Sequence, residues 1–188
     1  MTIRFVTGNE HKVAEAREYL DTPIEQVPYD YVEIQADDLE AIASTGARES
    51  FGAIGGDGPV VVEDSGLFIE ALDGFPGPYS SYIEGTLGIE RVWHLTEPES
   101  DTTARFESVV AYADGERTVT FHGRVSGHIV APRGTGGFGY DPIFEVNGRT
   151  LAERTTAEKN ELSHRGRALK RFADWWTDQA RGSRSGPG

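Results

Sequence analysis

The chain has 188 residues, a formal net charge of −13 and no cysteine. This length predicts a single domain, and the acidic balance argues against a nucleic-acid backbone or an anionic membrane as partner. Without cysteine there is no disulfide or thiolate site, so any metal must be bound by oxygen or imidazole. The sequence has no apolar run of about 18 residues and no charged leader, which predicts a soluble, cytoplasmic protein.

Lysine is scarce in this sequence. The 18 basic residues include only Lys12, Lys159 and Lys170, and the others are arginines. An acidic, lysine-poor composition is typical of halophilic proteins, so we expect the protein to work in a salt-rich cytoplasm. The scarcity also makes each remaining lysine a candidate for a specific role.

The N-terminal half predicts a strand–turn–helix start. Residues 3–6 (IRFV) form a short apolar run, Thr7-Gly8-Asn9 breaks it, and apolar residues then recur at helical spacing. A second strand is expected at 24–28. Polar and apolar residues alternate over 31–35 (YVEIQ), so that Glu33 shares a face with Tyr31 and Gln35. A helix is predicted over 38–51 and a loop over 55–59.

Residues 60–67 (VVVEDSGL) carry two acids directly after three valines. The pattern predicts a buried strand that ends in a Ser-Gly turn and delivers Glu63 and Asp64 to the edge of a ligand crevice. Such carboxylates suit a metal ion or a general base. An N-cap or a solvated turn is an equally good interpretation of these acids taken alone.

The C-terminal half predicts a helix over 85–95 and a long antiparallel hairpin whose strands, 103–112 and 117–125, flank Asp114-Gly115. A glycine-rich loop follows at 134–140. A last helix is predicted over 162–179, with its apolar stripe on Leu162, Leu169, Phe172, Ala173 and Trp176. The domain is expected to span 1–180 and to be followed by a disordered tail, 181–188. The fold class predicted is mixed α/β.

Two segments carry donors for anions. Thr7, Gly8, Asn9, Glu10, His11 and Lys12 lie between the first strand and the first helix. Backbone N–H groups at a helix start bind phosphate, although Asn9 as a simple helix cap explains the segment equally well. Ser163-His164-Arg165 opens the last helix and allows the same two interpretations.

The loop 134–142 (GTGGFGYDP) surrounds Phe138 with glycines. Glycine permits close backbone approach, and an aromatic ring offers a stacking face for a base. A flexible hairpin end with Phe138 folded into the core is the alternative. The turn at 75–80 (FPGPYS) needs no function beyond chain reversal.

In this order, the motifs resemble one family, the inosine triphosphate pyrophosphatases, also called Ham1-like or non-canonical purine nucleoside triphosphate pyrophosphatases. The matching segments are 7–12 (TGNEHK), 33–35 (EIQ), 62–67 (VEDSGL), 74–80 (GFPGPYS), 134–144 (GTGGFGYDPIF) and 158–169 (EKNELSHRGRAL). They extend over essentially the whole chain except the tail.

The resemblance implies an elongated α/β fold with two lobes flanking a central nucleotide cleft, a homodimer, and magnesium-dependent hydrolysis of ITP, dITP and XTP to the monophosphate and pyrophosphate. It implies that Asp64 is the metal ligand or proton acceptor and Glu33 a second metal ligand. Residues 7–12 and Ser65 would bind phosphates. The nucleotide base would lie against Phe138, Gly139, Tyr140, Asp141, His164 and Arg165, with Lys159 also in contact with the nucleotide.

Two positions depart from the family pattern. Some members carry a lysine where this chain has Gly46, and a basic residue where it has Ser81. Arg48 or potassium ions are the substitutes we expect for phosphate contact. Two rival functions remain: a Maf-like nucleotide pyrophosphatase, which lacks the Ser-His-Arg ending, and a nucleotide-binding module without hydrolysis.

Overall fold

The computed structural model describes residues 2–54 and 58–182. The chain divides into two compact units, each assembled from separate segments. Unit 1 comprises Met1–Asp64, Val109–Gly123 and Arg165–Gly188, and unit 2 comprises Ser65–Ser108 and Arg124–His164. Three strands contribute residues to both units: β3 (Val60–Ile69), β5 (Thr103–Ala113) and β6 (Thr118–Ile129).

Eight strands of the described residues form one mixed sheet in the order β2-β1-β3-β5-β6-β7-β8, with β4 paired to β3. The five short strands are β1 (Ile3–Val6), β2 (Ile24–Val27), β4 (Pro76–Gly77), β7 (Phe144–Val146) and β8 (Arg149–Thr150). β1 runs parallel to β2 and β3, whereas β3/β4, β6/β7 and β7/β8 are antiparallel. The predicted mixed α/β class and the long hairpin of β5 and β6 are therefore confirmed.

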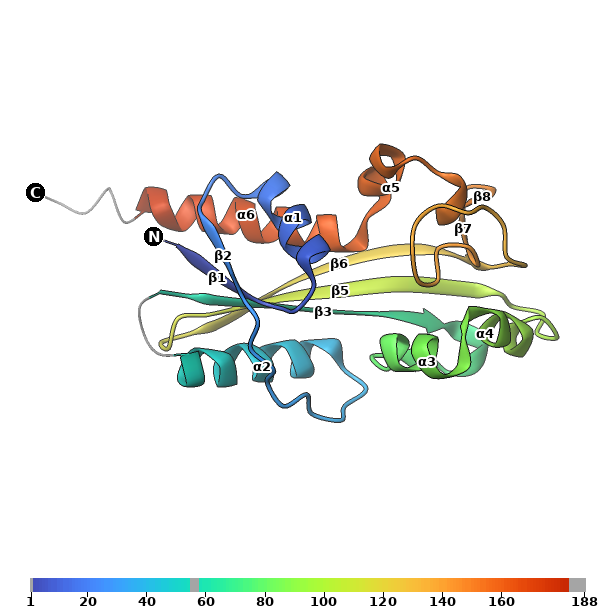
Figure 1. Cartoon of the computed structure of the whole chain (residues 1–188), viewed down its shortest axis with the longest axis horizontal. Coiled ribbons are helices and arrows are strands. Elements are labelled where there is room, and N and C mark those ends of the chain that lie inside the picture. Colours follow the sequence, from blue (N-terminus) through green and yellow to red (C-terminus); the bar gives the residue numbers. More distant parts are fainter. Residues whose placement is uncertain (1, 55–57, 183–188) are drawn as a thin grey trace, which may run out of the picture. The chain divides into compact units, whose positions relative to one another are not determined.

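Unit 1 has helices on both faces of its strands. Its helices are α1 (Glu10–Tyr19), α2 (Leu39–Ile54) and, from Arg165 onward, α6 (His164–Gly182). Figure 1 shows α1 and α6 on one face of the strands and α2 on the other. Phe5, Val13, Leu169 and Phe172 are buried in one apolar cluster. Four residues of the predicted stripe, Leu169, Phe172, Ala173 and Trp176, thus belong to the core of unit 1, whereas Leu162 packs against the core of unit 2.

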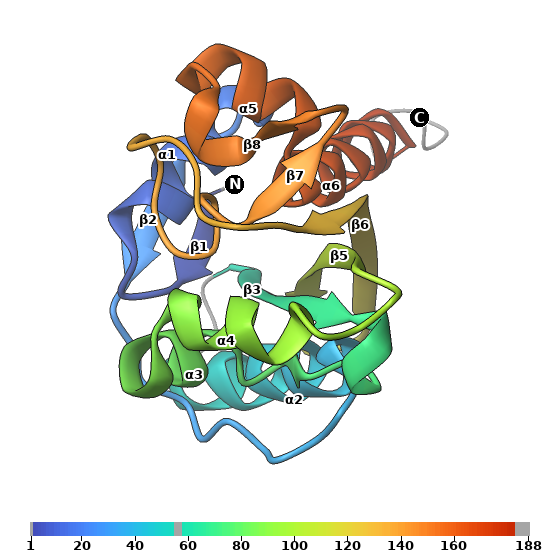
Figure 2. The same ribbon diagram turned by 90° about the vertical axis from the view of Figure 1, so that its right-hand side faces the viewer.

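Unit 2 has a core of its own. Its helical elements are the 3-10 turns η1 (Glu70–Leu72) and η2 (Leu151–Glu153), and the helices α3 (Ser80–Leu87), α4 (Ile89–Thr96) and α5 (Thr156–Leu162). Figure 2 shows α3 and α4 together on one side of this unit, with β7, β8 and α5 on the other. Leu67, Val92, Ile143 and Phe144 are among its fully buried residues.

The prediction of one continuous helix over 85–95 was wrong, because two helices occupy this region. Gly88 adopts a φ of 83° and separates α3 from α4. Its N–H group bonds to the carbonyl groups of Ile83 and Glu84 and so closes α3. The apolar spacing on either side gave no sign that one glycine would adopt a positive φ and end the helix.

The predicted turn after Asp64 was also wrong. β3 continues through Ser65 and Gly66 to Ile69, so both acids lie in mid-strand. The strand pairs with β1 at Val60 and Val61 and with β4 at Leu67 and Phe68. Pairing with β4 carries the strand past a Ser-Gly dipeptide that would otherwise favour a turn.

The segment 31–35 has no helix or strand, despite its alternating pattern. The last helix begins at His164, and Leu162 ends α5 instead. Residues 55–57 of the predicted loop and 183–188 of the predicted tail lie outside the described residues. Within 2–54 and 58–182, no helix is long and apolar enough to cross a lipid bilayer.

Candidate active site

A group of four charged side chains, one buried and three half-buried, lies around the middle of β3 in unit 1, and we call it the Glu63 cluster. It consists of Lys12, Glu15, Glu63 and Arg165. The Glu63 side chain has no exposed surface; its Oε2 lies 2.8 Å from Lys12 Nζ and its Oε1 lies 3.1 Å from Arg165 Nε. Arg165 Nη1 lies 3.1 Å from Glu15 Oε2. Two cations and two anions therefore neutralise one another beside Asp64.

The charge of Arg165 is maintained by its partners. Burial acts to lower the pKa of this guanidinium, but Glu63 and Glu15 outweigh it and raise the pKa above its ordinary value. The sequence assigned Lys12 to phosphates and Arg165 to the base. The structure brings both to the Glu63 carboxylate, which lies 51 residues from Lys12 and 102 residues from Arg165 in the sequence, so local pattern gives no means to predict the pairing.

Asp64 and Glu33 share an electrostatic neighbourhood around the Tyr31 hydroxyl. Burial raises the pKa of Tyr31, and the carboxylates of Asp64, Glu33 and Glu63 raise it further. Glu33 is exposed and Asp64 is half-buried. The two acids predicted to bind metal are thus near the same side chain, although 31 positions separate them in sequence.

These two acids suit magnesium as a donor set. Among residues 2–54 and 58–182, no group of three or more histidine or acidic side chains is arranged to hold a metal ion. Magnesium usually keeps several waters and binds one or two carboxylates together with substrate phosphates. Such an ion needs only one or two carboxylates from the protein, a number that Asp64 and Glu33 would supply.

The start of α1 carries the other predicted phosphate ligands. Asn9 caps the helix by accepting a hydrogen bond from the His11 N–H group at 2.9 Å, and Thr7 Oγ1 accepts one from the Asn9 N–H group. Gly8, Asn9, Glu10 and His11 are exposed. The capping role is therefore present, on an accessible helix start.

In unit 2, Phe138, Asp141 and Lys159 form a second group, which we call the Asp141 cluster. Asp141 is buried; its Oδ2 lies 2.5 Å from Lys159 Nζ and accepts the Phe138 N–H group at 2.9 Å. The Phe138 ring is 61% exposed, and Lys159 Nζ lies 4.1 Å from its centroid. The alternative that Phe138 folds into the core was wrong.

The conformation of the loop depends on Gly137. Its φ is +73°, and a Cβ atom there would lie 2.1 Å from Asp141 Oδ2. Any side chain at this position would displace the carboxylate that holds both Phe138 and Lys159. The glycine-rich pattern predicted close backbone approach, and here the group approached is a side chain of the protein itself.

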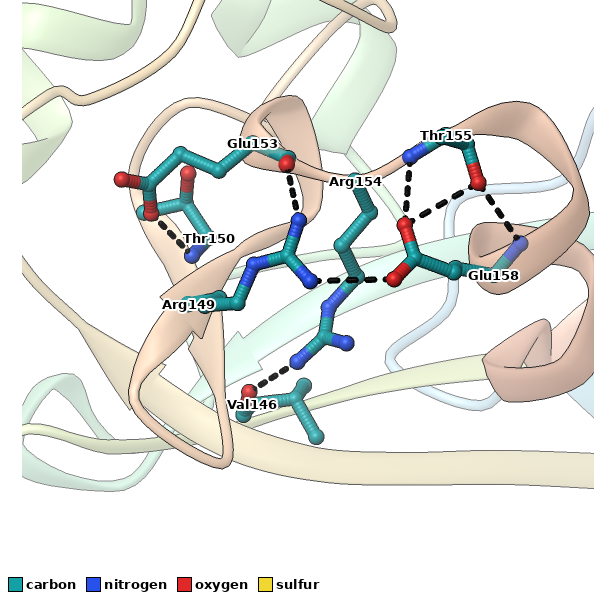
Figure 3. A network of polar contacts seen from close by, with 7 residues as sticks. All are labelled: Val146, Arg149, Thr150, Glu153, Arg154, Thr155 and Glu158. Atoms are coloured by element: carbon teal, nitrogen blue, oxygen red, sulfur yellow. Dashed lines mark hydrogen bonds and ion pairs between the residues drawn. The ribbon is translucent and has the colours of Figure 1, made fainter.

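Lys159 follows directly after a hydrogen-bonded network at the start of α5, shown in Figure 3. Two capping boxes follow each other, Thr150 with Glu153 and Thr155 with Glu158. Arg149 bonds to the Glu153 carbonyl group and lies 3.0 Å from Glu158 Oε1. Hydrogen bonds from Thr155, and then from Arg149, lower the pKa of Glu158 to about 2. The network fixes the first turn of the helix that carries Lys159.

The remaining predicted ligands have different environments. Tyr140 is buried, and its hydroxyl donates to the Ser80 carbonyl group at 2.9 Å. The His164 ring stacks on Phe106 with centroids 4.9 Å apart. Gly139 has a φ of +62°, and Ser65 is half-buried in β3. Tyr140 is therefore part of the packing of unit 2.

Comparison with known proteins identifies the family. The model of the Ham1 family matches residues 3–175. The chain belongs to the Ham1 family. The family predicted from the motifs is thus confirmed, and the match includes every predicted site residue.

Ham1 relatives are similar along their whole length. A protein of Thermococcus kodakarensis named dITP/XTP pyrophosphatase is 51% identical over 93% of this chain and 97% of its own. Its namesake from Methanopyrus kandleri is 49% identical over 97% of this chain and 100% of its own. The solved structure of a HAM1 protein from Coxiella burnetii, 35% identical, covers 95% of this chain and 99% of its own with a TM-score of 0.86.

Proposed function

We propose that this Ham1 protein hydrolyses non-canonical purine nucleoside triphosphates, ITP, dITP and XTP, to the monophosphate and pyrophosphate. Relatives that are 49 to 51% identical over nearly the whole chain carry the name dITP/XTP pyrophosphatase. The feature of this chain that supports the proposal is its pair of acids, Asp64, half-buried in β3, and Glu33, exposed in the segment 31–35. A module that only binds nucleotide has no need for a pair of metal-binding acids.

We assign the metal site to Asp64 and Glu33 and propose magnesium as the metal. When bound, magnesium neutralises phosphate charge and lowers the pKa of a coordinated water. Asp64 is the residue that takes the proton of the water attacking the α-phosphorus, while pyrophosphate leaves.

Lys12 supplies positive charge to the triphosphate. A lysine ammonium has three N–H donors. Two contacts of Lys12 Nζ are made within the protein, to Glu63 Oε2 at 2.8 Å and to the Glu63 carbonyl oxygen at 3.0 Å. The third donor serves a phosphate oxygen, with the exposed N–H groups at the start of α1 and Ser65 as further donors.

The Asp141 cluster is our candidate for the nucleotide base. The exposed Phe138 ring offers a stacking face, and Lys159 lies against it. The resemblance also assigns His164 and Arg165 to binding of the base. Deaminated purines carry a 6-keto group that accepts hydrogen bonds. Donors facing this edge of the purine would reject adenine, because its 6-amino group cannot accept their hydrogen bonds and leaves them unpaired.

We further propose a homodimer, a cytoplasmic location and adaptation to concentrated salt, the last because the chain combines a net charge of −13 with few lysines. Sedimentation at several salt concentrations tests the assembly and the salt requirement together. A monomer that is fully folded and active in dilute buffer would contradict both proposals.

The decisive experiment measures pyrophosphate release from a panel of nucleoside triphosphates, with magnesium, at high and low salt. We expect ITP, dITP and XTP to be preferred over ATP and GTP by about 10- to 100-fold for each discriminating contact. Release of orthophosphate would contradict cleavage between the α and β phosphates. Preference for other nucleotides would favour the Maf-like alternative, and binding without turnover would favour a binding module.

A further inference from the structure

Gly46, one of the departures from the family pattern, is in contact with Tyr31. A Cβ atom at position 46 would lie 2.5, 2.8 and 2.9 Å from three atoms of the Tyr31 ring. Carbon atoms do not approach so closely, so any side chain at 46 would force the ring away from α2. A lysine at position 46, which the resemblance leads us to expect, is therefore incompatible with the position of Tyr31 in this chain.

A second residue of α2 binds the same segment one turn further on. Glu49 accepts a hydrogen bond from the Val32 N–H group, at 3.2 Å from its Oε2, and one from the Tyr29 hydroxyl, at 3.4 Å from its Oε1. Residues three apart share one face of a helix. Gly46 and Glu49 thus present one surface of α2 to the segment 29–32.

Glu33 is the next residue along this segment. The segment contains no helix or strand, and the Glu33 side chain is exposed. Regular structure therefore does not fix Glu33, whereas the contacts of Tyr29, Tyr31 and Val32 with α2 immediately precede it. The contact between the Tyr31 ring and Gly46 thus lies two residues before Glu33.

We propose that Gly46 and Glu49 are positioning residues: they bind the segment 29–32 to α2 and so hold the carboxylate of Glu33 near Asp64, where both bind the divalent metal. The inference rests on the proposed role of Glu33 as a metal ligand. It also explains the absence of a lysine at position 46, since Tyr31 needs the space.

The chain supplies a matched control in the same helix. A Cβ atom at Gly52 would meet nothing within 4 Å, so Gly52→Ala and Gly46→Ala are the same chemical change in α2 with and without contact to Tyr31. The first measurement is Mn²⁺ binding to the full chain without nucleotide, followed by electron paramagnetic resonance. The second is the Mg²⁺ concentration that gives half-maximal pyrophosphate release.

We expect Gly46→Ala to weaken Mn²⁺ binding by about 10-fold or more, as for other residues that orient a metal ligand, and to raise the half-maximal Mg²⁺ concentration similarly. Gly52→Ala should bind Mn²⁺ as the unaltered protein does. Equal Mn²⁺ affinities in the two variants would overturn the inference.

Two further comparisons apply even if Gly46→Ala does not fold. Glu49→Ala removes both acceptors and Glu49→Gln keeps one, so the loss of Mn²⁺ affinity should be larger for alanine. Tyr31→Phe keeps the ring on Gly46 and should cost less affinity than Tyr31→Ala. If neither pair shows this order, the inference fails.

Glu33→Gln separates this inference from the proposed function. If Glu33→Gln weakens Mn²⁺ binding but the variants at 46 and 49 do not, the positioning role alone is wrong. If Glu33→Gln leaves Mn²⁺ affinity unchanged, Glu33 is not a ligand, and both the proposed metal site and the inference are wrong.

Discussion

The Glu63 cluster and the Asp141 cluster both pair a buried carboxylate with a lysine of similar exposure, 20% for Lys12 and 23% for Lys159, but they differ in the exposure of their further partner. In the Glu63 cluster the carboxylate has no exposed surface, and its partners Lys12 and Arg165 are 20% and 11% exposed. In the Asp141 cluster the partner Phe138 is 61% exposed. A closed ion network is costly to disrupt and rigid, whereas an exposed ring over a lysine is accessible to a ligand. The first cluster therefore suits support of the strand that carries Asp64, with Lys12, its most exposed member, as our proposed phosphate donor, and the second suits binding of the base.

The largest expected effect separates Asp64 from its neighbour Glu63. Asp64→Asn should reduce pyrophosphate release by about 10³-fold, within the range for loss of a general base or metal ligand. Its free energy of unfolding should stay near that of the unaltered protein, because Asp64 is only half-buried. A variant with near-normal turnover would remove Asp64 from the mechanism.

Substitutions of the two buried carboxylates test the comparison directly. Glu63→Gln removes the carboxylate partner of Lys12 and one of the two carboxylates that Arg165 contacts, and it should lower the free energy of unfolding by about 3 kcal/mol, as for other broken buried ion pairs. Asp141→Asn should cost less, about 1 to 2 kcal/mol, since only one cation, Lys159, loses its carboxylate and the amide oxygen can still accept a hydrogen bond. Urea titration of both variants measures the difference, and the opposite order would refute the distinction between the clusters.

Phe138 tests the binding role of the exposed cluster. Phe138→Ala should raise the KM for ITP by about 5- to 100-fold, the range that corresponds to loss of one base-stacking contact. Its free energy of unfolding should change by less than about 0.5 kcal/mol, because the ring is mostly exposed. Phe138→Tyr, which keeps a stacking face, is the control. Unchanged KM in Phe138→Ala would exclude stacking on this ring.

The smallest expected effect concerns the network before Lys159. The folded pKa of Glu158, about 2, is below the ordinary value of 4.5. Its contribution to stability is therefore present above pH 4.5 and is lost as the pH falls to about 2. Chemical denaturation of Glu158→Gln should show a stability deficit that shrinks over this interval. A deficit independent of pH would mean that the carboxylate charge is not the stabilising feature.

Local sequence pattern was sufficient to predict many of the helices and strands of this protein. The helix after Asn9 and the hairpin around Asp114-Gly115 follow from interactions within a few residues: a side chain caps its own helix, and a turn joins adjacent strands. The order of motifs was sufficient for the Ham1 family. These features need no partner from a distant segment, so they can be recognised in the sequence by itself.

Only the tertiary structure decided which charges meet. The valines before Glu63 predict a strand, but its pairing with β4 is what carries it past Gly66 to Ile69. The sequence identified Lys12 and Arg165 as site residues but not the carboxylate that both contact. It also marked Gly46 as unusual, while the reason, the Tyr31 ring against its Cα, is a contact between segments. Local propensity determines each helix or strand separately. Burial, in contrast, requires charged and aromatic side chains to be paired, and their partners can come from any part of the chain.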